Sequence, residues 1–233
     1  MFSGGYMTYI IITMIFAGIG SLVSKRLKSK FKKYSQVPMT NGMTGAEVAV
    51  RMLRFYQVDD VKVVQGEGFL TDHYNPSTKT VSLSPDVYNG RHVSAAAVAS
   101  HECGHAVQHA EAYAWLGFRS AMVPVVQVAS KMQSMIFMAA IVLASSALGP
   151  TIMLVAICIF GATTLFAVVT LPVEFDASNR ALNWLDESRV ATGIQHEGAK
   201  DALWWAAMTY VVSALSSVAV LGYLVMSYLG ARD

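Results

Sequence analysis

The sequence predicts a mainly α-helical membrane protein with about four transmembrane helices and a small α+β unit between them. Only 14% of the 233 residues are charged, whereas a soluble domain carries roughly 25%. No charged residue occurs in 1–24, 132–173 or 202–231. Outside these stretches the charge density is close to that of a soluble domain, so membrane and soluble parts alternate along the chain. This pattern excludes a disordered, collagen-like or small disulfide-stapled protein.

The uncharged stretches predict the transmembrane passes, because a bilayer core needs about 20 apolar helical residues. Tyr6–Val23 fits one pass, and its charges follow the apolar run, so we expect a retained anchor rather than a cleaved signal peptide. The 42-residue stretch suits two passes, at Ser134–Leu148 and Thr151–Leu171, joined by a turn at Gly149-Pro150. Leu203–Leu229 forms the last pass.

A basic cluster sets the expected orientation. Six of the 17 Lys and Arg residues lie between Lys25 and Lys33, directly after the first pass. Juxtamembrane basic residues stay on the cytoplasmic side, so residues 25–131 and 172–202 are both predicted there. The net charge of +2 argues against a nucleic-acid partner, and the expected non-protein partner is the lipid bilayer.

The soluble part predicts both helices and strands. Thr44 and Glu47 form a capping-box pattern at the start of a helix over 44–57. Residues 61–65 and 79–84 are β-branched or alternating and predict short strands, with a turn at Asn75-Pro76-Ser77 between them. An alanine-rich helix is expected over 94–115.

This last helix contains the sequence His101-Glu102-Cys103-Gly104-His105, which is the H-E-x-x-H pattern. Residues four apart lie on one helix face, so both imidazoles can bind one ion. Two neutral nitrogens and a carboxylate suit a single catalytic zinc ion with an open position for water. Glu102 is placed to accept a proton from that water, which predicts a zincin-like catalytic unit.

A third protein ligand is needed. His109 lies about 12 Å along the helix from His101, too far to share one ion, and is expected to be a surface residue or one that supports a ligand from behind. Glu174 follows the third pass, which returns the chain to the side of the histidines. Asp176 is the alternative ligand, or a residue that orients a ligand histidine.

Several motifs together make the chain resemble the YugP-type neutral zinc metallopeptidases, integral membrane proteins of bacteria that are distantly similar to the HtpX-like peptidases. The resemblance implies peptidase activity in the bacterial cell membrane, zinc ligands at His101 and His105, a catalytic Glu102 and a ligand at Glu174. HtpX-like peptidases place an aspartate four residues after the glutamate ligand, where this chain has Ser178. The motifs are Thr71-Asp-His-Tyr-Asn-Pro76, Leu83-Ser-Pro-Asp-Val-Tyr-Asn-Gly90, His101-Glu-Cys-Gly-His-Ala-Val-Gln108 and Pro172-Val-Glu-Phe-Asp-Ala-Ser178.

The strand before the motif helix is a candidate for binding a peptide or protein substrate. A free strand edge can pair with an extended backbone whatever its sequence. Lys79, Val81 and Leu83 are the residues expected to take part.

The predicted function is that of a membrane-bound zinc endopeptidase, and the sequence leaves its oligomeric state open. One alternative is an intramembrane-cleaving metalloprotease, although the polar motif helix is typical of a soluble or interfacial one. Another is a non-catalytic adaptor with a structural zinc, although such sites usually have four protein ligands. The expected organisation is an N-terminal anchor (1–24), a catalytic α+β segment (25–131), a transmembrane hairpin (132–171), a segment with the third ligand (172–202) and a C-terminal transmembrane helix (203–233).

Overall fold

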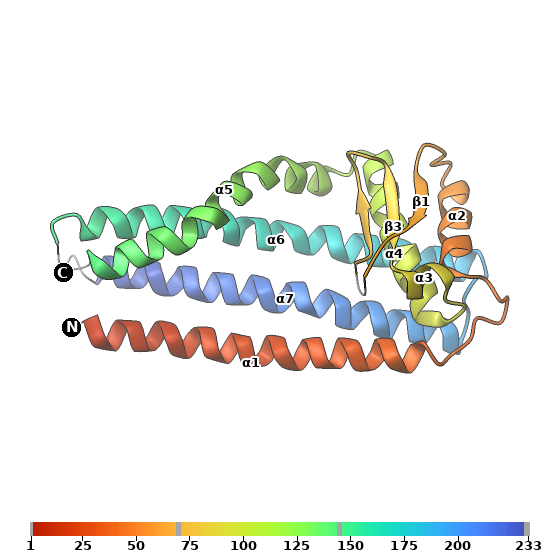
Figure 1. The fold of residues 1–233 in the computed structure, drawn as a ribbon, viewed down its shortest axis with the longest axis horizontal. Coiled ribbons are helices and arrows are strands. Elements are labelled where there is room, and N and C mark those ends of the chain that lie inside the picture. Colours follow the sequence, from red (N-terminus) through yellow and green to blue (C-terminus); the bar gives the residue numbers. More distant parts are fainter. Residues whose placement is uncertain (1, 69–70, 144–145, 231–233) are drawn as a thin grey trace. The chain divides into compact units, whose positions relative to one another are not determined.

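Long helices dominate the computed structural model, which describes residues 2–68, 71–143 and 146–230 (Figure 1). The chain forms two compact units, one made of Met1–Leu22, Phe118–Leu171 and Thr209–Asp233, the other of Val23–Gly117 and Pro172–Met208. In chain order the elements are α1 (Phe2–Tyr34), α2 (Gly45–Phe55), β1 (Lys62–Gln65), β2 (His73–Asn75), β3 (Thr80–Leu83), α3 (Pro85–Asn89), α4 (Val93–Ala110), α5 (Ala114–Val142), α6 (Gly149–Glu187) and α7 (Ile194–Leu229).

The mainly helical membrane fold is confirmed. Within the described residues, three helices are long and apolar enough to cross a membrane: α1 from Met7, α6 and α7. The expected pass at Ser134–Leu148 includes residues 144 and 145, which lie outside the described part, so it stays a prediction. Many large apolar side chains of the first unit are exposed, including Met14, Leu165 and Met226, as expected of surfaces that face lipid.

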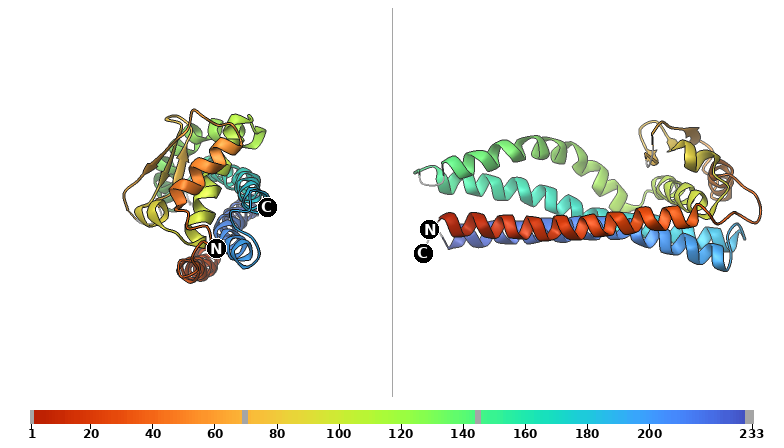
Figure 2. Two further views of the ribbon diagram at one scale, coloured as in Figure 1. Left: turned by 90° about the vertical axis from the view of Figure 1, so that its right-hand side faces the viewer. Right: turned by 60° about the horizontal axis from the view of Figure 1, so that its bottom comes forward.

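The two helices around the predicted transmembrane hairpin differ from the expectation in where they begin. The helix that contains the start of the second predicted pass is longer than that pass: α5 begins at Ala114, contains Pro124 and is bowed (Figure 2). Gly149-Pro150 does not form the turn but starts α6. The first turn of a helix has no intrahelical acceptors for its N–H groups, so a proline costs nothing there. The predicted turn at 149–150 was therefore wrong.

A three-stranded sheet in the second unit has the order β1-β3-β2, with β1 parallel and β2 antiparallel to β3. The central position of β3 contradicts the expected substrate-binding role of Lys79, Val81 and Leu83. Both edges of β3 are paired with neighbouring strands, so neither can accept a peptide backbone. Val81 and Leu83 are fully buried, and Lys79 forms an ion pair with Asp60.

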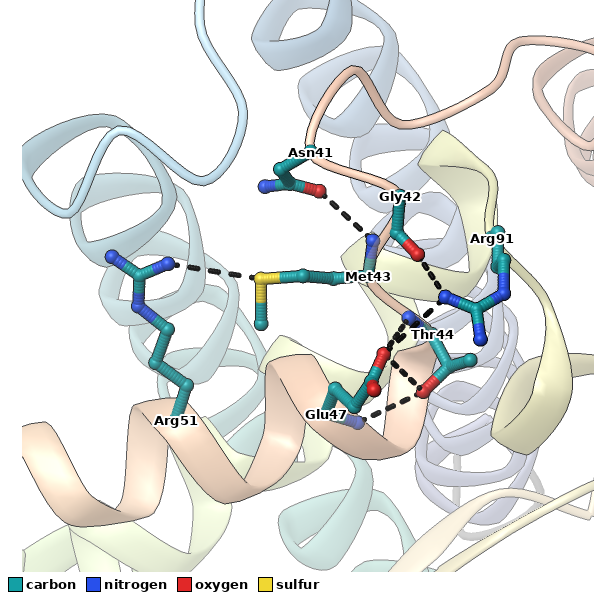
Figure 3. Close-up of polar contacts among 7 residues, drawn as sticks. All are labelled: Asn41, Gly42, Met43, Thr44, Glu47, Arg51 and Arg91. Carbon is teal, nitrogen blue, oxygen red and sulfur yellow. Dashed lines mark hydrogen bonds and ion pairs between the residues drawn. The ribbon is translucent and has the colours of Figure 1, made fainter.

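The capping box predicted for α2 is present (Figure 3). The Thr44 hydroxyl accepts a hydrogen bond from the Glu47 backbone N–H at 3.1 Å, and the Glu47 carboxylate accepts one from the Thr44 backbone N–H at 2.7 Å. The hydrogen bonds that the Thr44 backbone N–H and hydroxyl donate to this carboxylate lower the pKa of Glu47. Arg91 donates to the Gly42 carbonyl and forms an ion pair with Glu47, which ties the chain before α4 to the start of α2.

The core of the second unit surrounds α4, which is buried almost along its whole length. Its alanines let neighbouring helices approach closely, and α2 packs against it with Val48, Ala49 and Met52 fully buried. The expected helix over 94–115 is confirmed, although α4 ends at Ala110. This core holds the motif helix in a fixed position.

Replacing Thr44 with Ala removes the hydroxyl half of the capping box. We expect the free energy of unfolding of the second unit to fall by about 1 kcal/mol, measured by thermal unfolding in detergent. Thr78→Ala is the matched control, because Thr78 is exposed and its hydroxyl forms no hydrogen bond with the described residues. Equal effects of the two substitutions would contradict this role of the cap.

Candidate metal centre

Three potential metal ligands lie together in the second unit. His101 and His105 are on consecutive turns of α4, and Glu174 is on α6. Glu174 Oε2 lies 3.3 Å from His101 Nε2 and 3.6 Å from His105 Nε2. One ligand atom from each residue lies within 4.8 Å of the other two. The arrangement brings together the two histidines and the glutamate singled out in the sequence.

This donor set fits a zinc ion. It consists of two imidazole nitrogens and one carboxylate oxygen, the combination found in catalytic zinc sites that keep one position for water. The Glu174 side chain is only 2% exposed, and the two imidazoles are its neighbours. Burial by itself would lower the pKa of His105, but the hydrogen bond and charge of Glu174 outweigh it and raise this pKa. A cation bound between the three groups would likewise balance the buried carboxylate.

Close backbone contact between α4 and α6 makes this geometry possible. Gly104 lies between the two ligand histidines, and a Cβ atom there would lie 2.5 Å from the carbonyl oxygen of Ala177. Val173 and Ala177 are fully buried on either side of Glu174. Only glycine at position 104 therefore allows α6 to approach the motif helix this closely.

Each ligand histidine has a second polar neighbour through its other ring nitrogen. Nδ1 of His101 lies 3.1 Å from the Ser178 hydroxyl, and Nδ1 of His105 lies 3.1 Å from Oε1 of Gln108. Neither role was predicted from the sequence. The available signals were spacings: Ser178 comes four residues after Glu174, and Gln108 three residues after His105.

Asp176 does not belong to the group that could hold a metal, and no hydrogen bond or ion pair joins it to a ligand histidine. Its Oδ2 accepts hydrogen bonds from Gln108 Nε2 at 2.8 Å and from Arg180 Nε at 2.5 Å. The carboxylate thus reaches His105 only through Gln108.

Three other residues of α4 with titratable side chains, Glu102, Cys103 and His109, do not belong to the potential metal group. Glu102 is 9% exposed and follows His101 directly in the chain, and its role as proton acceptor stays a prediction. His109 is exposed and its Nδ1 lies 2.7 Å from the Tyr74 hydroxyl, outside the ligand group. Cys103 is fully buried with its thiol 3.5 Å from the Ala49 carbonyl oxygen, and burial raises the pKa of the thiol.

Replacing Gly104 with Ala should disrupt the centre. The added methyl group meets the α6 backbone, so we expect a loss of about 1–3 kcal/mol in the free energy of unfolding together with weaker zinc binding. Gly117→Ala is the matched control, because a Cβ there meets nothing within 4 Å. Zinc stoichiometry by elemental analysis and thermal unfolding would check both variants; unchanged zinc binding in Gly104→Ala would contradict the contact.

Comparisons with known proteins agree with this geometry. The chain matches, over residues 8–229, the model of a family described as "Putative neutral zinc metallopeptidase". It is 40% identical to the "Putative membrane protease YugP" of Bacillus subtilis strain 168, over 97% of this chain and 99% of that protein. No solved structure matches the chain. Since the family model covers nearly all of the chain and includes both helices of the metal centre, the chain belongs to this family of zinc metallopeptidases.

Proposed function

We propose that the protein is a membrane-bound endopeptidase that hydrolyses peptide bonds at a single zinc site. The observation that carries this proposal is the convergence of His101, His105 and Glu174 within 4.8 Å, with Glu102 on the same helix. Zinc supplies Lewis acidity there, lowering the pKa of a water molecule and polarising the substrate carbonyl.

The protein residues have distinct roles in this proposal. His101, His105 and Glu174 hold the ion and leave one position for water. Glu102 accepts the proton of the attacking water and then donates it to the leaving amine, so that it acts first as general base and then as general acid. Glu102 is buried to 9% exposure next to His101 in the chain, which supports a role close to the proposed ion.

For the substrate backbone we propose the outer edge of β2, which pairs with no further strand among the described residues, since both edges of β3 are paired. β2 is an outer strand of the sheet and contacts α4 through Tyr74, whose hydroxyl bonds His109 one turn beyond His105. An extended polypeptide added to this edge would be recognised mainly through its backbone. This supports a peptide or protein substrate.

Two observations favour this function over the alternatives. Among the described residues, α4 is not a candidate membrane span, which argues against an intramembrane-cleaving protease. The potential metal group contains three ligands rather than four, which argues against a purely structural zinc in an adaptor.

We also place the catalytic unit on the cytoplasmic side of a bacterial cell membrane. Support comes from the basic residues of α1, which are exposed at Lys25, Arg26, Lys28, Lys32 and Lys33. Cations directly after a membrane span are retained on the cytoplasmic side.

Activity and metal content together test the function. Glu102→Gln should retain one zinc per chain but cleave fluorescein-labelled casein at least about 100-fold more slowly than the native protein. His101→Ala and His105→Ala should lose zinc and activity together. His109→Ala, on the same helix, should keep its zinc. A native protein without stoichiometric zinc, or full activity in Glu102→Gln, would overturn the proposal.

Cysteine labelling tests the side of the membrane. With both native cysteines replaced by Ala, Ala110→Cys offers a thiol at an exposed position of α4. We expect a membrane-impermeant maleimide to label it only after intact cells are permeabilised, because the side chain is cytoplasmic. Labelling of intact cells would place the site outside.

A further inference from the structure

Gln108 is the residue of α4 most completely enclosed by polar partners. Its side chain is fully buried, and its amide nitrogen lies 2.8 Å from the Val173 carbonyl oxygen and 2.8 Å from Asp176 Oδ2. Both partners are on α6, on either side of Glu174. The amide oxygen lies 3.1 Å from His105 Nδ1. The nitrogen and the oxygen of this buried amide thus both have hydrogen-bond partners within the protein.

These contacts determine which way the amide points. A carbonyl oxygen and a carboxylate only accept hydrogen bonds, so the group facing Val173 and Asp176 must be the NH₂ group of Gln108. Its oxygen then faces His105 and can only accept. Nδ1 of His105 must therefore carry a hydrogen, which leaves Nε2, on the side of Glu174, as the nitrogen available to a metal.

Asp176 is itself held in place. Arg180 donates from Nε to Asp176 at 2.5 Å and from Nη1 to Glu111 at 2.6 Å, and its guanidinium lies 5.8 Å from the centre of the Tyr113 ring. A chain of hydrogen bonds thus runs from Arg180 through Asp176 and Gln108 to His105, and the two bonds that Asp176 accepts are charge-assisted. Such bonds are shorter and stronger than neutral ones.

The other ligand histidine lacks such a constraint. Nδ1 of His101 faces the Ser178 hydroxyl, which can donate or accept by rotating. Ser178 is therefore compatible with either tautomer of His101, whereas Gln108 is compatible with only one state of His105 Nδ1. The two histidines can therefore be compared within one protein: the neighbour of His105 fixes its tautomer, and the neighbour of His101 does not.

We propose that Gln108, locked by Val173 and Asp176, is a positioning residue that fixes His105 with Nδ1 protonated and Nε2 directed at the metal. The inference rests on the proposed zinc site but not on peptidase activity. Residues that orient a metal-bound histidine in this way contribute 10–100-fold to metal affinity in general.

Zinc affinity of the full-length protein in detergent tests the proposal, measured by competition with a chromophoric chelator. Gln108→Met keeps the length of the side chain and removes its hydrogen bonds; we expect a loss of affinity of about 10–100-fold. Asp176→Asn keeps an acceptor for Gln108 but removes its charge, and should cause a smaller loss. The absorption spectrum of the cobalt-substituted protein should change in Gln108→Met, because the geometry of His105 relaxes.

Ser100→Ala is the matched control for loss of a buried hydrogen bond on α4. The Ser100 hydroxyl donates only to carbonyls of its own helix, so zinc affinity and the cobalt spectrum should stay native. Nitrogen-15 spectra of labelled histidine should show a protonated Nδ1 for metal-bound His105. Native zinc affinity and an unchanged cobalt spectrum in Gln108→Met would overturn the inference while leaving the zinc site intact. Absence of zinc from the native protein would instead overturn the proposed function.

Discussion

The close approach of the α4 and α6 backbones at Gly104 and Ala177 is the constraint on which the metal centre depends. A single methyl group at position 104 would lie 2.5 Å from a carbonyl oxygen of α6, so the two helices meet with no side chain between them. Glu174 lies one turn before this contact and Ser178 immediately after Ala177. One contact therefore brings both the third ligand and the neighbour of His101 to the motif helix.

The same contact explains how the Glu174 carboxylate can be buried with only 2% of its side chain exposed. An isolated charge buried in a protein interior is unstable unless it is paired, and Glu174 meets two imidazoles whose outer nitrogens are themselves hydrogen-bonded. The outer contacts of the two histidines differ, because Gln108 faces His105 and Ser178 faces His101.

Much of the centre follows from local spacing, which is why the sequence was informative about it. His101 and His105 share a helix face because they are four residues apart, and Glu174 could be placed beside them by counting membrane passes. The central position of β3 could not be predicted from local spacing, because strand pairing joins residues that are distant in the chain. The short strand β2 was also not predicted, since it ends at the Asn75-Pro76 turn. Gln108 stands out in the sequence as a polar residue on an apolar helix. Its partners on α6 could not be predicted, because Val173 lies 65 positions further along the chain. Pro172 did not end the helix, so Glu174 lies within α6, on the part of that helix that belongs to the second unit.

The distribution of the ligands along the chain has a consequence during protein synthesis. His101 and its neighbour Ser178 are separated by 77 positions, and at about 5–20 residues per second the ribosome needs several seconds to pass from one to the other. For nearly all of that interval the residues of the motif helix have been made, including Gln108, whereas Glu174 and Ser178 have not. A nascent chain can therefore bring His101, His105 and Glu174 together only after α6 has been made.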